Sequence, residues 1–196
     1  MGYQILCITD HNIIADHSDL NDEDFLMLTG YEAYIRPNKK AKSARYLPEV
    51  HLNLFARDKD NDKYICYNRI YCKYFKDDHE KLNRVGSEEP REYTTEYINM
   101  FIKTATENGY VVSYNHPVWS MESDEKIFEL EGWQSLELDN TDSYLISCLE
   151  HNEVLYDKLL RRGIRVGCHG GDDNHNKQPF GHPLCDVELR IPGEHS

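Results

Sequence analysis

Apolar and polar residues alternate along the first third of the chain in blocks that predict β-strands. A continuous apolar run over residues 3–9 is typical of a buried strand. Residues 25–35 predict a second β-type segment, which Gly30 interrupts, and residues 50–56 predict a further strand. The stretches between these segments are polar and read as loops, over residues 10–24, 36–48 and 58–62.

From residue 94 onward the pattern predicts helices alternating with strands. The apolar residues of the first helix recur three and four positions apart, at Ile98, Phe101, Ile102 and Ala105. Thr94 or Thr95 is its predicted N-cap, and Gly109 is its predicted stop. Further elements are predicted as strands over 110–114, 133–138 and 164–168 and as a helix over 148–162. Strands joined by helices indicate an α/β fold with a parallel sheet or barrel, in a single domain over residues 1–196.

Charge and cysteine usage narrow the classes of partner and compartment. The chain has 35 acidic and 22 basic residues, a net charge of −13. This excess argues against attachment to long nucleic acid or to an anionic membrane, but not against a small phosphorylated substrate held through metal ions. Its six scattered cysteines form no Cys-x-x-Cys pair, which favours a reducing compartment. Without a signal-type segment or a long apolar run, we expect a cytoplasmic protein.

Imidazoles and carboxylates gather where the predicted strands end. They are Asp10 and His11, then His116, then Asp173 with His175. Loops at the carboxyl ends of parallel strands meet at one edge, so we expect these side chains to converge. Glu32 and His51 are further candidates, from the two β-type segments between them. A mixed set of imidazoles and carboxylates suits Zn, Mn or Fe.

Five short motifs resemble, in their order along the chain, those of the PHP family, named after polymerase and histidinol phosphatase. They are Ile8-Thr9-Asp10-His11-Asn12, Gly30-Tyr31-Glu32, Val50-His51-Leu52, Asn115-His116-Pro117 and Gly171-Asp172-Asp173-Asn174-His175. The resemblance spans roughly residues 3–183. It implies a distorted seven-stranded (β/α) barrel that holds one to three divalent ions and hydrolyses phosphate esters with a metal-activated water.

The same resemblance implies a role for each matching residue. Glu32 is expected to bridge two ions, with His51 and His116 as its partners on one of them. Asp173 is expected to bind a second ion, and His11 with His175 a third. Asp173 or a neighbouring histidine such as His116 is the expected proton shuttle, and Asp10 is expected to orient His11 or a substrate-side water.

One departure from the family pattern qualifies these expectations. The family opens with a His-x-His motif on its first strand, and only Met1 and Gly2 precede Tyr3 here. We therefore expect a barrel that is incomplete at the N-terminus and short of a closing strand and helix at the C-terminus, as a fragment, a misplaced start or a degenerate member. Its open sheet edges would favour a homo-oligomer. Two alternative functions stay open: binding of metal or phosphate without turnover, and hydrolysis of a C–N bond.

The remaining histidines and the basic loop are interpreted as structural or solvent-exposed. The histidines are His17, His79, His151, His169, His182 and His195. A role at the site is the alternative for His17 and His169, which lie near the predicted strand ends, and contact with substrate is the alternative for His182. The basic residues after the Glu32 segment are Arg36, Lys39, Lys40 and Lys42. We interpret them as a solvated loop, with a phosphate-gripping loop as the alternative.

Overall fold

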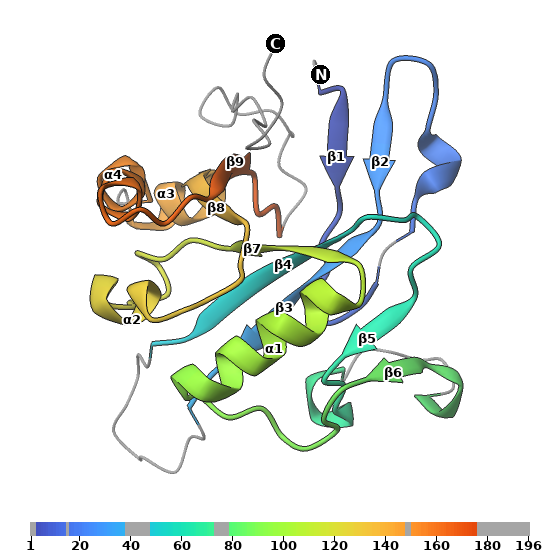
Figure 1. Cartoon of the computed structure of the whole chain (residues 1–196). Coiled ribbons are helices and arrows are strands. Elements are labelled where there is room, and N and C mark those ends of the chain that lie inside the picture. Colours follow the sequence, from blue (N-terminus) through green and yellow to red (C-terminus); the bar gives the residue numbers. More distant parts are fainter. Residues whose placement is uncertain (1–2, 15, 38–47, 73–78, 148–149, 176–196) are drawn as a thin grey trace.

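A mixed five-stranded sheet in the order β3-β4-β7-β8-β9 lies at the centre of the molecule (Figure 1). The computed structural model describes residues 3–14, 16–37, 48–72, 79–147 and 150–175. The strands of the sheet are β3 (Gly30–Ile35), β4 (Val50–Ala56), β7 (Tyr110–Tyr114), β8 (Ser135–Asn140) and β9 (Gly167–Gly171).

Strand β4 runs against both of its neighbours, whereas β7, β8 and β9 are parallel. Strand β3 therefore points the same way as β7. The first residues of β4 consequently lie beside the carboxyl ends of β3 and β7, with His51 opposite Tyr34 and Leu52 opposite Tyr114. This one reversed strand brings residues from the start of β4 to the edge where the other strands end.

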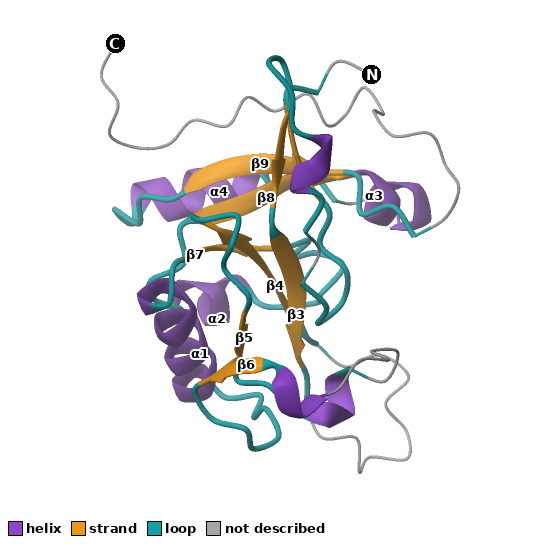
Figure 2. Ribbon diagram, turned by 90° about the vertical axis from the view of Figure 1, so that its right-hand side faces the viewer, coloured by secondary structure: helices purple, strands orange, loops and turns teal. Residues whose placement is uncertain are grey.

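One face of the sheet is apolar and packs on helix α1 (Thr95–Glu107) and the short helix α2 (Asp124–Phe128) (Figures 1 and 2). The fully buried residues of this core include Leu52, Leu54, Val112, Tyr114, Ile98, Phe101 and Ile102. The helix begins as expected, because the Thr94 side chain accepts a hydrogen bond from the Tyr97 main-chain N–H. It ends at Glu107, and Gly109, two residues further on, has a φ of +89° that favours glycine.

The other face of the sheet is polar. Alternate residues on the central strands are His51 and Asn53 on β4, Ser113 on β7, and Ser135 and Glu137 on β8. These side chains are nevertheless buried. Burial of polar groups lowers the stability of the fold unless each group has a hydrogen-bond or charge partner. A buried polar face of this kind is typical of a functional site.

The remaining elements are smaller and flank the sheet. They are the parallel pairs β1 (Ile5–Cys7) with β2 (Leu26–Leu28) and β5 (Lys63–Ile65) with β6 (Asn83–Val85), the helices α3 (Thr141–Ser147) and α4 (Glu153–Arg161), and the 3-10 turns η1 (Ser18–Leu20), η2 (Arg69–Tyr71) and η3 (His79–Lys81). Helices α3 and α4 lie beside β8 and β9 (Figure 2).

The predicted distorted (β/α)7 barrel is wrong. The described strands form one open mixed sheet and two separate pairs, and they do not close on themselves. A (β/α) barrel needs a crossover between parallel neighbours after each strand, whereas β3, β4 and β7 are joined antiparallel. Within the five-stranded sheet, the β7–β8 and β8–β9 pairs have the expected arrangement, in which parallel neighbours are connected through helices. The connection is α2 for the first pair and α3 with α4 for the second.

Several predicted boundaries also need correction. The first strand is the short β1 rather than a buried strand over 3–9, and its Ile5 is 44% exposed. The last strand is β9 rather than 164–168, because the Ile164 main-chain N–H still bonds back to Leu159 at the end of α4. Strand β9 reads Gly-Cys-His-Gly-Gly, which lacks the apolar residues typical of a strand.

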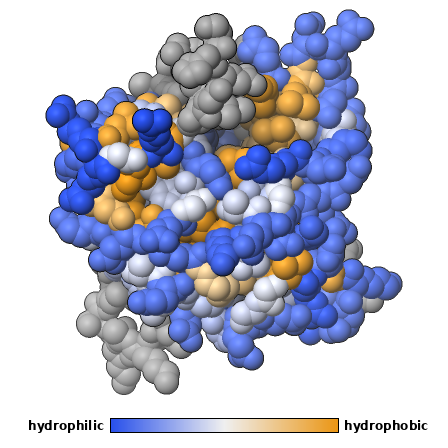
Figure 3. Space-filling model, in the orientation of Figure 1, coloured by the Kyte–Doolittle hydropathy of each residue, from blue (hydrophilic) through white to orange (hydrophobic). Residues whose placement is uncertain are grey.

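The face of the molecule seen in Figure 3 is largely hydrophilic, with apolar residues in separate patches. Exposed large apolar residues are spread over several elements, among them Leu20, Ile70, Val154 and Leu160. None of the helices in the described ranges combines the length and apolar character that crossing a bilayer requires.

The packing of α1 on the sheet should provide a large part of the stability. Phe101 is fully buried, so Phe101→Ala leaves a cavity and should lower the free energy of unfolding by about 3–5 kcal/mol. Val154→Ala is the matched control, because Val154 is 68% exposed and its truncation should cost less than about 0.5 kcal/mol. Urea unfolding of both variants measures the difference. Equal losses would contradict this description of the core.

Candidate metal centre

The carboxyl-end edge of the sheet carries a pocket with a volume of about 230 Å³. Its lining contains all six predicted metal ligands together with three further residues: His11, Glu32, His51, His116, Trp119, Asp142, Ser143, Asp173 and His175. His116 follows β7 and Asp173 follows β9, so the expected convergence of strand ends is confirmed for these two. His51 reaches the same edge because it stands at the start of the reversed strand β4.

Glu32 is the centre of the first ligand group. Its Oε2 lies 2.9 Å from His11 Nδ1, and its Oε1 lies 3.3 Å from His51 Nδ1 and 3.4 Å from His116 Nε2. Asn115 Nδ2 donates to Oε1 at 2.7 Å. Burial alone would raise the pKa of this carboxyl, but the charge on His51 and the contacts with His11 and His116 hold it well below its usual range.

His51 has an unusual environment for a histidine. Burial alone would lower its pKa, but the Glu32 carboxylate, with Glu49 behind it, outweighs burial and raises the pKa to about 9. His51 Nδ1 is buried and forms an ion pair with Glu32 Oε1 at 3.3 Å, although this contact lacks hydrogen-bond geometry. Imidazole nitrogens that converge on one buried carboxylate fit the arrangement of metal ligands.

A second ligand group adjoins the first. Ligand atoms of Asp142, Asp173 and His175 lie within 4.8 Å of one another. His175 Nδ1 is 3.5 Å from Asp173 Oδ1 and 3.7 Å from Asp142 Oδ2. The rings of His11 and His175 are 5.7 Å apart, and His116 Nε2 is 4.0 Å from Asp173 Oδ2. The pocket therefore holds two adjoining sets of side chains, and in each of them three residues, His11, Glu32 and His51 or Asp142, Asp173 and His175, are close enough together that they could hold a metal ion.

The backbone at this edge is unusual at two of the ligands. His116 has φ of +25° and Asp173 has φ of +48°, both in the left-handed region that non-glycine residues rarely adopt. The His116 ring is held by Ser120, whose Oγ lies 3.2 Å from Nδ1. Trp119 packs on His51 and His116 with ring centroids 5.3 and 4.9 Å away, so one wall of the pocket is aromatic.

Asp10 is not brought into this pocket. Its side chain is exposed, whereas its main-chain carbonyl accepts hydrogen bonds from the N–H groups of Glu32 and Ile13. His169 is buried beside Ser113 and Ser135, away from the pocket lining. His182 and His195 lie outside the described residues, as do the three lysines of the basic loop (Lys39, Lys40 and Lys42).

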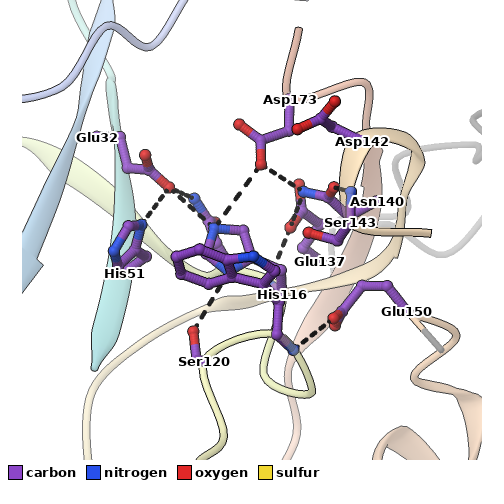
Figure 4. A network of polar contacts seen from close by, with 12 residues as sticks. Glu32, His51, His116, Ser120, Glu137, Asn140, Asp142, Ser143, Glu150 and Asp173 are labelled. Carbon is purple, nitrogen blue, oxygen red and sulfur yellow. Dashed lines mark hydrogen bonds and ion pairs between the residues drawn. The ribbon is translucent and has the colours of Figure 1, made fainter. Parts of the chain in front are cut away.

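Sequence reasoning missed Asp142 and the residues beneath the pocket, Glu137 and Asn140. Asp142 stands in a polar block, Asp139-Asn-Thr-Asp142, which follows a predicted strand in the same way as the other candidates do. Glu137 is a single acid within a predicted strand, and the burial that raises its pKa to about 8 follows from the fold. Figure 4 shows these residues with Glu32, His51 and His116 around the pocket.

Comparison of the chain with models of known protein families, with curated proteins and with solved structures finds no match. Membership of the PHP family therefore stays a prediction that rests on the five motifs. The geometry itself establishes a coarser point, which is that histidine, glutamate and aspartate side chains are grouped so that they could hold a metal ion.

The metal-free protein should lose stability as the pH rises from 7 to 9. The folded pKa values of His51 and Glu137, about 9 and about 8, lie above their unfolded values, so both groups stabilise the fold only while they keep their protons. This stabilisation is complete below the unfolded pKa values and is lost as the pH passes through the folded ones. Over this interval the free energy of unfolding should fall by on the order of 2 kcal/mol.

Urea unfolding in a chelating buffer at pH 7, 8 and 9 measures this dependence. His51→Gln removes one of the two groups and should flatten the curve. A free energy of unfolding that stays constant or increases between pH 7 and 9 would contradict the assigned protonation of the pocket.

Proposed function

We propose that this chain is a metal-dependent hydrolase of phosphate esters. The observation that carries the proposal is the buried Glu32 carboxylate in contact with the three imidazoles of His11, His51 and His116. A second group of two carboxylates and an imidazole lies beside it in the same pocket. Two adjoining groups of this kind are typical of centres that act on phosphoryl oxygens.

The side chains fit a divalent cation on their own chemistry. Buried imidazoles of His51 and His116 converge with that of His11 on a carboxylate whose pKa is held low. Imidazole with carboxylate favours Zn, Mn or Fe, in one to three positions. A cation bound there would lower the pKa of a coordinated water and stabilise negative charge on the substrate.

The residues around the pocket have separable roles in this proposal. His11, Glu32, His51 and His116 would hold one cation, and Asp142, Asp173 and His175 would hold another. Asp173 is the candidate proton acceptor, because its side chain is partly exposed and lies between His116 and His175. The Trp119 ring covers the two buried imidazoles and would keep bulk water from that side of the centre.

Phosphate esters are favoured over other substrates by the order of the five motifs, since the metals alone do not fix the bond that is broken. The pocket of about 230 Å³ suits a small phosphorylated group. The net charge of −13 disfavours long nucleic acid as the substrate. An amide or other C–N bond is the substrate class that a similar metal centre would otherwise hydrolyse.

The first test is metal content and phosphatase activity of a His116→Ala variant. The purified protein should contain Zn, Mn or Fe by elemental analysis and should hydrolyse p-nitrophenyl phosphate. Because His116 contacts both Glu32 and Asp173, its loss should lower metal affinity and activity by roughly 100-fold or more. The matched control is His17→Ala, at a partly buried histidine outside the pocket, which should change neither.

A wild-type protein that binds none of these metals, or a His116→Ala variant with unchanged activity, would refute the proposal. Parallel assays with a phosphomonoester and an amide substrate decide which bond is hydrolysed. Metal binding without turnover of either substrate would identify the chain as a binding module.

A further inference from the structure

A buried glutamate that does not line the pocket connects its two ligand groups. Glu137 on β8 is 2% exposed, and its Oε2 accepts two hydrogen bonds. One comes from the His116 main-chain N–H at 2.8 Å and the other from Asn140 Nδ2 at 3.0 Å (Figure 4). The Glu137 carboxyl group therefore contacts the backbone of His116 rather than its ring.

Asn140 extends this contact to the second ligand group. Its Nδ2 also lies 3.2 Å from Asp173 Oδ2, while its Oδ1 accepts from the Ser143 main-chain N–H at 2.8 Å. Since both ends of the amide are engaged and Asn140 is 1% exposed, its orientation is fixed. Glu137 thus reaches Asp173 through one intervening side chain.

The two residues that are connected in this way are the two ligands with left-handed backbone. A non-glycine residue with φ of +25° or +48° is in a sparsely populated conformation, which persists only where its surroundings hold it. At His116 the hydrogen bond from its own N–H to Glu137 is a direct restraint on that conformation.

Gly171 makes room for the carboxylate. A Cβ atom at this position of β9 would lie 2.0 Å from Glu137 Oε1, which is far closer than van der Waals contact allows. Any side chain at residue 171 would therefore displace the Glu137 carboxyl group. This group is buried, so it has little space into which it can move. The glycine offers a way to disturb Glu137 without replacing it.

A second buried acid, Glu150, contacts the loop that carries His116, two and three residues after that histidine. Glu150 is fully buried and accepts hydrogen bonds from the main-chain N–H groups of Val118 at 3.2 Å and Trp119 at 2.7 Å. Asn152 Nδ2 joins the two acids, since it donates to the Glu137 main-chain carbonyl at 3.1 Å and to Glu150 Oε1 at 2.8 Å. The loop that carries His116 is thus tied to β8 from two sides.

We propose that Glu137 is a positioning residue that fixes His116 and Asp173 relative to each other and thereby sets the geometry shared by the two ligand groups. The positioning concerns the metal-free fold, whereas its effect on metal binding rests on the proposed function. The two parts are therefore tested by separate measurements.

Hydrogen exchange of the metal-free protein tests the positioning. Glu137→Leu removes the acceptor, and Gly171→Ala displaces it, so both should accelerate exchange of the His116 amide by about tenfold or more. Amides of α1 should be unaffected. Glu137→Gln should stay within about threefold of wild type, because the amide oxygen can accept both hydrogen bonds at the Oε2 position. Asp157→Asn, at an exposed acid on α4, is the control.

Titration with Co²⁺ tests the consequence for metal binding. Glu137→Leu and Gly171→Ala should weaken cobalt affinity by about 10–100-fold and alter the visible spectrum of the bound ion, whereas Glu137→Gln should preserve both. If Glu137→Leu does not fold, Gly171→Ala and Asn140→Ala provide the same comparison.

The inference is overturned if exchange at His116 is unchanged in these variants, or if α1 amides accelerate equally, which would indicate general destabilisation. It is also overturned if faster exchange leaves cobalt affinity and spectrum unaltered. If the wild-type protein binds no cobalt, the proposed function fails, and the exchange measurement alone decides the role of Glu137.

Discussion

The buried charge of Glu32 is the constraint around which the rest of this structure is arranged. A carboxylate that is 4% exposed would be strongly destabilising alone, so it must be compensated by charge and hydrogen bonds. Three imidazoles and the Asn115 amide provide this compensation, and they come from the ends of different strands. The pocket therefore contains buried charged groups that cost stability of the fold and need several partners, as is usual for functional sites.

The reversed direction of β4 makes that compensation possible. With β4 antiparallel to β3 and β7, His51 stands at the same edge as the residues that follow β7 and β9. The apolar face of the same strand packs on α1 through Leu52 and Leu54. The two faces of β4 therefore have different roles. One face contributes to the hydrophobic core, and the other presents buried polar groups to the pocket.

The candidate ligands could be predicted from the sequence more completely than the architecture that holds them. Five of them, His11, His51, His116, Asp173 and His175, lie near an end of a predicted strand, whereas Glu32 lies inside β3, and the structure brings all six to one pocket. The predicted barrel, in contrast, is wrong. Strand direction depends on long-range pairing, such as His51 opposite Tyr34, which leaves no local pattern. Glu137 was missed for the same reason, since its role depends on neighbours brought close by β8 and β9, whereas Asp142 had a strand-end signal that could have identified it.

Anomalous diffraction from crystals grown with Zn²⁺ shows whether the Glu32 group binds a divalent metal ion. We expect an anomalous peak in contact with Glu32 and at least two of His11, His51 and His116, and we expect this peak to be lost in Glu32→Gln. A peak confined to exposed acidic residues, or a pocket without anomalous signal at saturating zinc, would contradict this expectation.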